Sequence, residues 1–156
     1  MVIVMTDVEI DLETEAETQA FGRRLAGVAA RGDVIGLSGP LGAGKTTLAR
    51  GFLQAAAAVD EAPSPTFGFV ETYDGAGGGI WHFDLYRLEN AEDVWELGLE
   101  DALEHGICLI EWPEKIERFL PPSLLAIGLC PIGTRRRARL RAGDEWRDRM
   151  TAAGII

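Results

Sequence analysis

The sequence is short of lysine, asparagine and cysteine, and each shortage excludes a class of site. Only two of the 156 residues are lysine, and the net charge of −10 disfavours broad contact with a nucleic-acid backbone. The one asparagine, Asn90, is followed by alanine, so the N-K-x-D loop that recognises guanine in common GTPases is missing. Cys108 and Cys130 lie far apart in apolar runs without metal-ligand spacing, and we expect both to be buried, reduced thiols.

Long hydrophobic runs are absent as well. No stretch approaches the roughly 18 consecutive apolar residues of a membrane-spanning helix. No repeat or low-complexity linker divides the chain, and 47% of its residues are hydrophobic. Residues 1–156 are therefore long enough for one domain around one continuous core. We expect a single-domain, soluble, cytoplasmic protein with no export signal and no membrane partner.

The charge is unevenly distributed along the chain. Residues 131–156 contain seven arginines and three acidic residues, a net charge of +4, which leaves −14 for residues 1–130. Within residues 135–141, arginines alternate with Ala138 and Leu140, as on an edge strand with one solvated face. We expect such an edge strand there, while a local contact between these arginines and tRNA stays open.

Hydrophobic spacing predicts strands and helices in alternation. A capping-box pair, Thr14 and Glu17, begins a helix that we expect to end at Gly32. The run before Glu111 has no polar interruption, as in a parallel strand covered on both faces. Two further runs around a glycine-rich tip predict a hairpin. Strands are expected at residues 8–12, 34–39, 67–73, 80–88, 107–112, 124–129 and 135–141, and further helices at 45–58 and 91–104.

This order of elements predicts an α/β fold, a P-loop NTPase-like three-layer sandwich. Its mixed sheet has parallel central strands and flanking antiparallel strands. A strand, a glycine loop and a helix follow one another through residues 34–58. That succession is the structural context in which a glycine-rich phosphate loop is credible.

The octapeptide GPLGAGKT, residues 39–46, carries the strongest chemical signal and matches G-x-x-x-x-G-K-[ST]. A backbone free of Cβ atoms can turn its N–H groups toward phosphate oxygens, and the following helix aims its positive end at the same charge. We expect Lys45 to contact the β- and γ-phosphates and the Thr46 hydroxyl to bind Mg²⁺. The expected nucleotide-binding residues of this loop are Gly39, Leu41, Gly42, Ala43, Gly44, Lys45, Thr46 and Thr47.

A magnesium ion held by one hydroxyl and phosphate oxygens also needs a carboxylate at the end of a neighbouring strand. Glu111 is the first choice, because it ends the apolar run at the carboxyl edge of a central strand. Asp84 is the second, although its run alternates like an antiparallel strand with one buried face. From the pattern alone Asp84 is equally well explained as a structural acid.

Four further residues are considered, two with a functional and a structural interpretation and two with a structural one alone. Thr66, after two prolines, is either a γ-phosphate-sensing residue or an ordinary turn residue. Trp112 would point to the opposite side of the strand from Glu111, which favours a core tryptophan. His82 and His105 have no metal-ligand spacing, and we expect both to be structural.

Five blocks of the sequence together resemble the bacterial TsaE family, also called YjeE. They are GPLGAGKTT, SPTFGFVETY, HFDLYRL, ELGLED and IEWPEK, and with their intervals they extend the resemblance over roughly residues 12–141. The resemblance implies a small ATPase that uses ATP and Mg²⁺ and works with the TsaB and TsaD proteins. These proteins make threonylcarbamoyladenosine in tRNA. TsaD carries out the transfer, so the TsaE member would meet tRNA only indirectly.

The resemblance also implies roles for individual residues by position. Catalytic roles fall on Lys45, Asp84 and Glu111, and metal binding falls on Thr46 and Glu111. The resemblance also implies that Thr66 is a switch-like element and that Trp112 is an aromatic neighbour of the nucleotide.

The sequence departs from the family at Pro40, where relatives often carry aspartate, and in the unusually glycine-rich hairpin tip. No arginine is obviously placed as a finger, with Arg87 an unsupported candidate, so we expect slow hydrolysis without partners. Two other functions stay open. One is a P-loop small-molecule kinase, and the other is a nucleotide-gated binding module whose hydrolysis is incidental.

Overall fold

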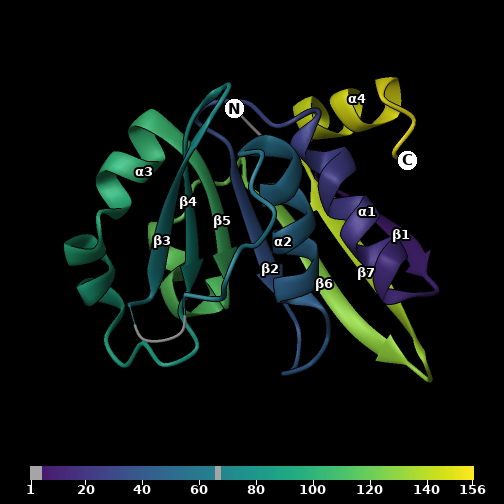
Figure 1. Cartoon of the computed structure of the whole chain (residues 1–156), viewed down its shortest axis with the longest axis horizontal. Helices are drawn as coiled ribbons and strands as arrows, with labels where there is room; N and C mark the ends of the chain where they lie inside the picture. The colour runs from purple at the N-terminus through teal and green to yellow at the C-terminus, as the bar shows by residue number, and fades with distance from the viewer. Residues whose placement is uncertain (1–4, 66–67) are drawn as a thin grey trace.

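The computed structural model describes residues 5–65 and 68–156, and its seven strands form one sheet in the order β1-β7-β6-β2-β5-β4-β3 (Figure 1). The strands are β1 (Thr6–Leu12), β2 (Val34–Ser38), β3 (Val70–Gly75), β4 (Gly78–Asp84), β5 (Gly106–Glu111), β6 (Leu125–Ile132) and β7 (Arg135–Ala142). The α-helices are α1 (Glu15–Ala26), α2 (Lys45–Ala56), α3 (Leu99–His105) and α4 (Asp144–Ala152), and the 3₁₀ helices are η1 (Ala91–Leu97) and η2 (Pro113–Phe119).

The sheet is mixed in the way the sequence predicts. Strands β6, β2, β5 and β4 run parallel at its centre. Strand β3 pairs antiparallel with β4, which confirms the hairpin, and β7 pairs antiparallel with β6. Because the chain crosses over between the parallel strands, the carboxyl ends of β2, β4 and β5 meet at one edge of the sheet.

Strand β7 corrects the prediction of an arginine-rich edge strand. It lies inside the sheet, because β1 pairs with it from Arg136 to Ala142 and forms the edge instead. The solvated arginine face is confirmed: Arg137 donates to Asp11 at 2.9 Å and Arg139 to Glu9 at 2.8 Å. Acidic residues of β1 therefore neutralise the arginines of β7 across the strand pair.

Helices cover both faces of the sheet, which gives the predicted three layers. In β5, Ile107 and Leu109 pack in the cluster beneath α1 and α2, which lie over the near face in Figure 1. Cys108 and Ile110 pack in the second cluster, with residues of η1 and α3. All four side chains are buried, as expected for a strand covered on both faces.

The two cysteines differ, so the expectation that both are buried is half right. Cys108 is buried in β5, and burial raises the pKa of its thiol to about 12. Cys130 is exposed. It lies on the opposite face of β6 from the buried Ile127 and Leu129, at the end of the strand. The apolar residues that flank Cys130 in the sequence do not show which face of the strand its side chain occupies.

Two predicted helices have different bounds in the structure. The first ends at Ala26, six residues before Gly32, although Thr14 does cap it by accepting from the Glu17 amide at 3.1 Å. The helix expected over residues 91–104 is interrupted at Gly98, whose φ of 91° ends η1 before α3 begins. A left-handed glycine is a common helix terminator, so the sequence contained this signal.

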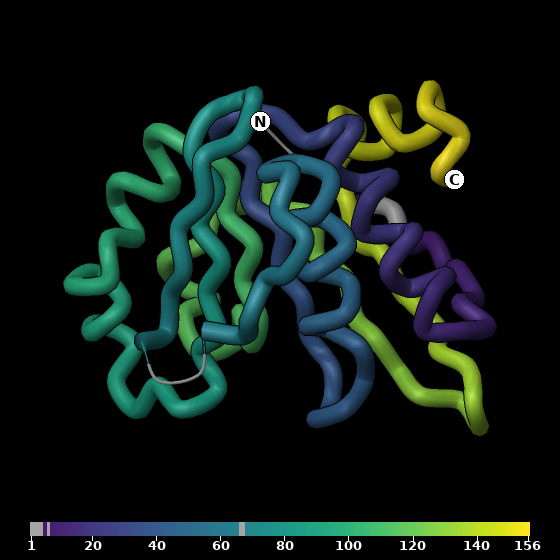
Figure 2. Tube along the Cα trace, viewed as in Figure 1, coloured from purple at the N-terminus to yellow at the C-terminus, as the bar shows by residue number. Residues whose placement is uncertain are grey.

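The C-terminal helix α4 was not predicted. Its Trp146 and Met150, four residues apart, are buried in the same cluster as α1 and α2. Arg149 donates to Asp33 and to the Val28 carbonyl, each at 2.7 Å. Figure 2 follows the chain as it returns beside the segment that leaves α1. The helix therefore closes one end of the core and ties the C-terminus to that segment.

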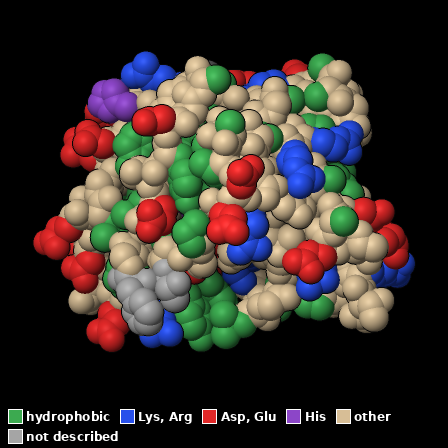
Figure 3. All heavy atoms as spheres, in the orientation of Figure 1, with side chains coloured by type: hydrophobic (Ala, Val, Ile, Leu, Met, Phe, Trp, Pro, Cys, Tyr) green, Lys and Arg blue, Asp and Glu red, His purple; other side chains and the backbone are tan. Residues whose placement is uncertain are grey.

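Acidic side chains gather along the edge formed by η1 and α3, at the left of the view in Figure 3. Such an edge repels a phosphate backbone, in agreement with the net charge of the chain. The exposed acids of this edge are Glu92, Asp93, Glu96, Glu100, Asp101 and Glu104.

None of the helices in the described part of the chain is long and apolar enough to cross a membrane.

Two glycines allow α1 and α2 to pack with their backbones in contact. A Cβ at Gly22 would lie 2.1 Å from the Leu48 carbonyl oxygen, and one at Gly51 would lie 2.0 Å from the Gln19 carbonyl oxygen. Real Cβ atoms do not approach oxygen this closely, so any larger side chain separates the helices. Because α2 follows the glycine loop directly, this contact also sets the position of that loop.

The Gly51→Ala variant tests this packing. Helix propensity alone predicts a gain of about 1 kcal/mol from alanine. We expect the opposite, a loss of about 1–3 kcal/mol in the free energy of unfolding, because the added methyl overpacks the helix pair. Urea denaturation measures the difference. Gly77→Ala is the control, since a Cβ at Gly77 meets no atom within 4 Å, and a stabilised Gly51→Ala protein would contradict the packing argument.

Candidate active site

The loop between β2 and α2 owes its shape to glycine. Gly39 and Gly44 have φ angles of 137° and 104°, which favour glycine strongly. At Gly39 a Cβ would also lie 2.4 Å from the Leu129 carbonyl oxygen. The loop can therefore adopt this tight path, with α2 beginning at Lys45 immediately after it. The orphan N–H groups of the first turn of α2 face the mouth of the loop.

Lys45 lies across this mouth rather than in solvent. Its Nζ donates to the carbonyl oxygens of Gly39 at 2.6 Å and Pro40 at 2.9 Å, and lies 4.2 Å from the centre of the Trp112 ring. Burial lowers the pKa of the Lys45 ammonium, and the attraction of nearby carboxylates, led by Glu111, opposes that shift. The ammonium is thus held between backbone oxygens, an aromatic face and an acidic neighbour.

Glu111 is a buried carboxylate with two side-chain partners. Its Oε1 accepts from the Thr46 hydroxyl at 2.8 Å, and its Oε2 lies 2.7 Å from His82 Nε2. Only 2% of Glu111 and 1% of His82 are exposed. An ionised carboxylate only accepts hydrogen bonds, so His82 donates from Nε2. This leaves His82 Nδ1 buried without a partner among the described residues.

His82 is a buried neighbour of Glu111, a contact that the sequence analysis did not predict. It was expected to be structural because no metal or nucleophile partner stood near it in sequence. Its partner, Glu111, lies on the adjacent parallel strand β5. In the register of these two strands, Glu111 stands opposite Asp84 of β4. His82 and Asp84 are two residues apart in β4 and so point to the same face. That spacing was the available signal. His105, by contrast, is exposed, and its Nδ1 lies 3.9 Å from Asp101 of the same helix.

Asp84 and Glu111 stand side by side at the carboxyl ends of β4 and β5. The prediction of an antiparallel strand for Asp84 is half right, because β4 is antiparallel to β3 but parallel to β5. The parallel pairing brings Asp84 to the edge of the sheet where Glu111 emerges. Asp84 is fixed there by hydrogen bonds from the Tyr86 amide at 3.2 Å and the Ser64 hydroxyl at 3.3 Å.

The expectation of a core tryptophan is half right, because Trp112 is half-buried against the second cluster and also lines the pocket beside Glu111. Strand β5 ends at Glu111, and Trp112 adopts a left-handed backbone with φ of 62° and ψ of 51°. This turn breaks the strand alternation, so the ring lines the same pocket as Glu111. It packs against Tyr86 with ring centres 4.9 Å apart. A strained conformation in a large residue is common at functional sites.

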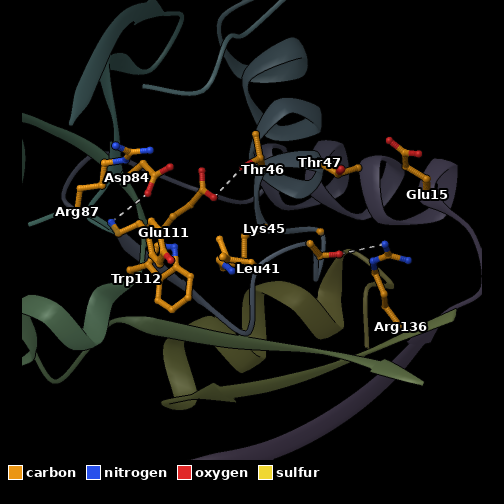
Figure 4. A pocket seen from close by; sticks show the side chains of 13 residues that line it. Glu15, Leu41, Lys45, Thr46, Thr47, Asp84, Arg87, Glu111, Trp112 and Arg136 are labelled. Atoms are coloured by element: carbon orange, nitrogen blue, oxygen red, sulfur yellow. Dashed lines mark hydrogen bonds between the residues drawn. The ribbon is translucent and has the colours of Figure 1, made fainter. Parts of the chain in front are cut away.

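Except for the buried His82, these side chains line one pocket of about 450 Å³, which Figure 4 shows from close by. It brings together most of the predicted site residues, while Gly39 and Ala43 do not line it and Thr66 lies outside the described residues. The prediction did not include Glu15, Tyr86 or Arg136. The lining residues are Glu15, Leu41, Gly42, Gly44, Lys45, Thr46, Thr47, Asp84, Tyr86, Arg87, Glu111, Trp112 and Arg136.

Comparison with known proteins agrees with this arrangement. A family model described as "Threonylcarbamoyl adenosine biosynthesis protein TsaE" matches residues 12–138. The chain belongs to the TsaE family. The TsaE protein of Rickettsia conorii is 37% identical over 127 residues, which cover 81% of this chain and 73% of that protein. The TsaE protein of Bacillus subtilis is 36% identical over 140 residues, which cover 88% and 81%.

The fold agrees with the family as well. The crystal structure of Bacillus subtilis YdiB superposes with a TM-score of 0.78 and 27% sequence identity, covering 98% of this chain and 97% of YdiB. The P-loop-like α/β sandwich predicted from the sequence is therefore confirmed. As a TsaE family member, the chain belongs to a group of proteins of tRNA threonylcarbamoyladenosine biosynthesis.

The hydrogen bond between His82 and Glu111 predicts unequal effects of two substitutions. His82→Leu removes the donor and leaves one oxygen of a buried carboxylate unpaired, so we expect a loss of about 1–3 kcal/mol in the free energy of unfolding. His82→Gln retains an N–H donor and should lose clearly less. Urea denaturation at neutral pH compares the two. His105→Leu, at an exposed histidine, is the control, and equal losses for Leu and Gln at position 82 would contradict the bond.

Proposed function

We propose that this TsaE family member binds ATP with Mg²⁺ in the pocket and hydrolyses it in support of TsaB and TsaD. The observation that carries the proposal is the 2.8 Å hydrogen bond between Thr46 and Glu111. It joins the first turn of α2, after a glycine loop, to the carboxyl end of a central strand. A hydroxyl and a carboxylate in that relation are the protein ligands that a P-loop offers to nucleotide-bound Mg²⁺.

The loop residues fit a phosphate group. Gly42 and Gly44 line the pocket without side chains, so the backbone can approach an anion closely. Lys45 Nζ at present donates to two loop carbonyls. A phosphate oxygen carries more negative charge than a carbonyl oxygen and is the stronger partner for an ammonium. We therefore expect Lys45 to exchange these carbonyls for the β- and γ-phosphates.

The residues also fit Mg²⁺, provided that the nucleotide supplies oxygens. Within residues 5–65 and 68–156, no three His, Cys, Asp or Glu residues form a cluster that could hold a metal ion. Mg²⁺ is commonly bound by one or two protein oxygens together with phosphates and water. Thr46 and Glu111 would hold it here. When bound, the ion offsets the charge of the phosphates.

The chain's own residues divide the remaining work between them. Lys45 stabilises the negative charge that develops as water attacks the γ-phosphorus and the bond to the bridging oxygen breaks, which leaves ADP and phosphate. Asp84, fixed by Tyr86 and Ser64, orients the attacking water. His82 holds Glu111 in place through its second oxygen. Catalysis of this kind depends on position and charge rather than on covalent chemistry.

The mouth of the pocket supports a role for partner proteins. Leu41 is 65% exposed and Tyr86 is 43% exposed, and both line the pocket. Large apolar side chains at the rim of a site commonly contact another protein. TsaB and TsaD are the partners we propose, with tRNA reached through them. A site open to water on this side should turn over slowly until a partner covers it.

The Glu111→Gln variant tests this function. We expect it to bind ATP within a few-fold of the original protein, while the rate of phosphate release falls about 100-fold or more because the carboxylate is gone. The assay measures free phosphate with and without TsaB and TsaD, together with threonylcarbamoyladenosine formed in tRNA. Glu117→Gln, at an exposed glutamate of the neighbouring η2, is the matched control.

Each outcome separates the functions that the sequence leaves open. Hydrolysis that TsaB and TsaD accelerate, and that Glu111→Gln abolishes together with tRNA modification, supports the proposal. If tRNA modification survives Glu111→Gln, the protein is a nucleotide-gated binding module. If phosphate appears on a small acceptor instead of in free form, the protein is a kinase. Fast hydrolysis that partners leave unchanged would contradict the proposed dependence on them.

A further inference from the structure

Trp95 is a large exposed side chain that the proposed function does not use. Three large hydrophobic side chains are exposed among the described residues, and two of them, Leu41 and Tyr86, line the mouth of the pocket. Trp95 lies elsewhere, on η1, and is 41% exposed. Tryptophan is enriched among the residues that contribute most of the binding energy in protein interfaces. The surroundings of Trp95 therefore indicate what a partner at this place would carry.

Trp95 forms one wall of a groove of about 430 Å³ against α3. Gly98 separates the two walls, because its left-handed backbone, with φ of 91°, ends η1 just before α3 begins. The Phe119 ring of η2 packs against the Trp95 ring with centres 4.9 Å apart, which holds the indole in place. We call this the Trp95 groove, and its lining residues are Trp95, Glu100, Leu103 and Glu104.

The carboxylates of the Trp95 groove lack basic partners within the protein. Residues 89–104 contain seven acidic residues and neither lysine nor arginine. Glu100 and Glu104 form no ion pair with any residue that the structure describes. Acids of β1 differ in this respect, since Glu9 and Asp11 are paired with arginines of β7. The negative charge of the groove is therefore available to a cation from another molecule.

This arrangement of charge opposes the stability of α3. Glu100 and Glu104 are four residues apart on one helix, where like charges repel each other. Glu104 also lies in the last turn of α3, at the negative end of the helix dipole. Natural proteins break such local rules mainly at functional sites. Two acids that do not stabilise their own helix, beside an exposed tryptophan, indicate a role in binding.

We propose that the Trp95 groove is a docking surface for a protein segment that carries arginine next to apolar residues. A guanidinium can stack on the Trp95 ring and donate to the carboxylates of α3 at the same time. An apolar neighbour in the segment would pack on Leu103. A nucleic acid is disfavoured, because its phosphates would meet the same carboxylates. The proposal does not depend on ATP binding, since the groove and the pocket share no lining residue.

The probe is a capped hexapeptide in which two arginines alternate with two leucines between terminal glycines. Two-dimensional NMR of the isotope-labelled protein follows the Trp95 indole N–H and the amides of α3 as peptide is added. We expect these signals to shift saturably, with a dissociation constant of about 1 mM or below. A peptide with glutamines in place of the arginines, or with glycines in place of the leucines, should bind about fivefold more weakly or worse.

Two double variants with the same change of charge test the protein side. Glu100→Gln with Glu104→Gln removes the carboxylates of the groove and should weaken binding of the arginine peptide about tenfold. Asp144→Asn with Asp148→Asn removes an acidic pair of equal spacing from α4, at the opposite end of the molecule (Figure 1), and should leave binding unchanged. The midpoint of urea denaturation should not fall for the Glu100→Gln, Glu104→Gln protein, because the change removes repulsion within α3.

Substitutions of Trp95 complete the test. Trp95→Leu should weaken binding of the arginine peptide, and Trp95→Phe, which keeps an aromatic ring, should recover part of it. Equal binding of the arginine and glutamine peptides, or of the peptide by the two double variants, would overturn the proposal. It would also be overturned if a single-stranded RNA oligonucleotide shifted the same signals more strongly, or if the unmodified protein formed a dimer that Trp95→Leu dissociates. A protein that binds the peptide but neither ADP nor ATP would contradict the proposed function alone.

Discussion

The hydrogen bond from Thr46 to Glu111 is the contact on which the site depends. A carboxylate with 2% exposure needs donors, and it finds one on the first turn of α2 and another in His82 of β4. The two donors and the carboxylate belong to three separate elements, α2, β4 and β5, so these contacts form only where β2, β4 and β5 run parallel and end at one edge. The glycine contact between α1 and α2 then fixes where α2 begins.

The pocket has an electrostatic order that follows from the sheet. Carboxylates emerge at the ends of β4 and β5, on one side of the phosphate loop, and Arg136 enters from β7 on the other side. Lys45 lies between them, on α2. Arg137 and Arg139 of β7 are paired instead with acidic residues of β1. The pocket thus holds cationic side chains next to the phosphate loop and two carboxylates at the ends of neighbouring strands, although the chain as a whole is negatively charged.

Local patterns in the sequence predicted what depends on neighbours along the chain. The glycine loop, the buried strand ending at Glu111 and the hairpin all have local signals, and the structure contains them. What failed depended on pairing between distant segments. The position of β7 inside the sheet required knowing that β1 covers it. The partnership of His82 with Glu111 required the register between β4 and β5. Trp112 turned into the pocket because its backbone left the strand conformation, which alternation cannot foresee.

The most direct measurement is a crystal structure with Mg²⁺ and a non-hydrolysable ATP analogue. We expect the triphosphate inside the loop, with Lys45 moved from the carbonyls of Gly39 and Pro40 onto the β- and γ-phosphates. We also expect Mg²⁺ between Thr46 and Glu111, with the Glu111 carboxylate reaching the ion directly or through one water. A structure with the loop empty at saturating analogue, or with Mg²⁺ bound and Glu111 turned away from it, would contradict the account.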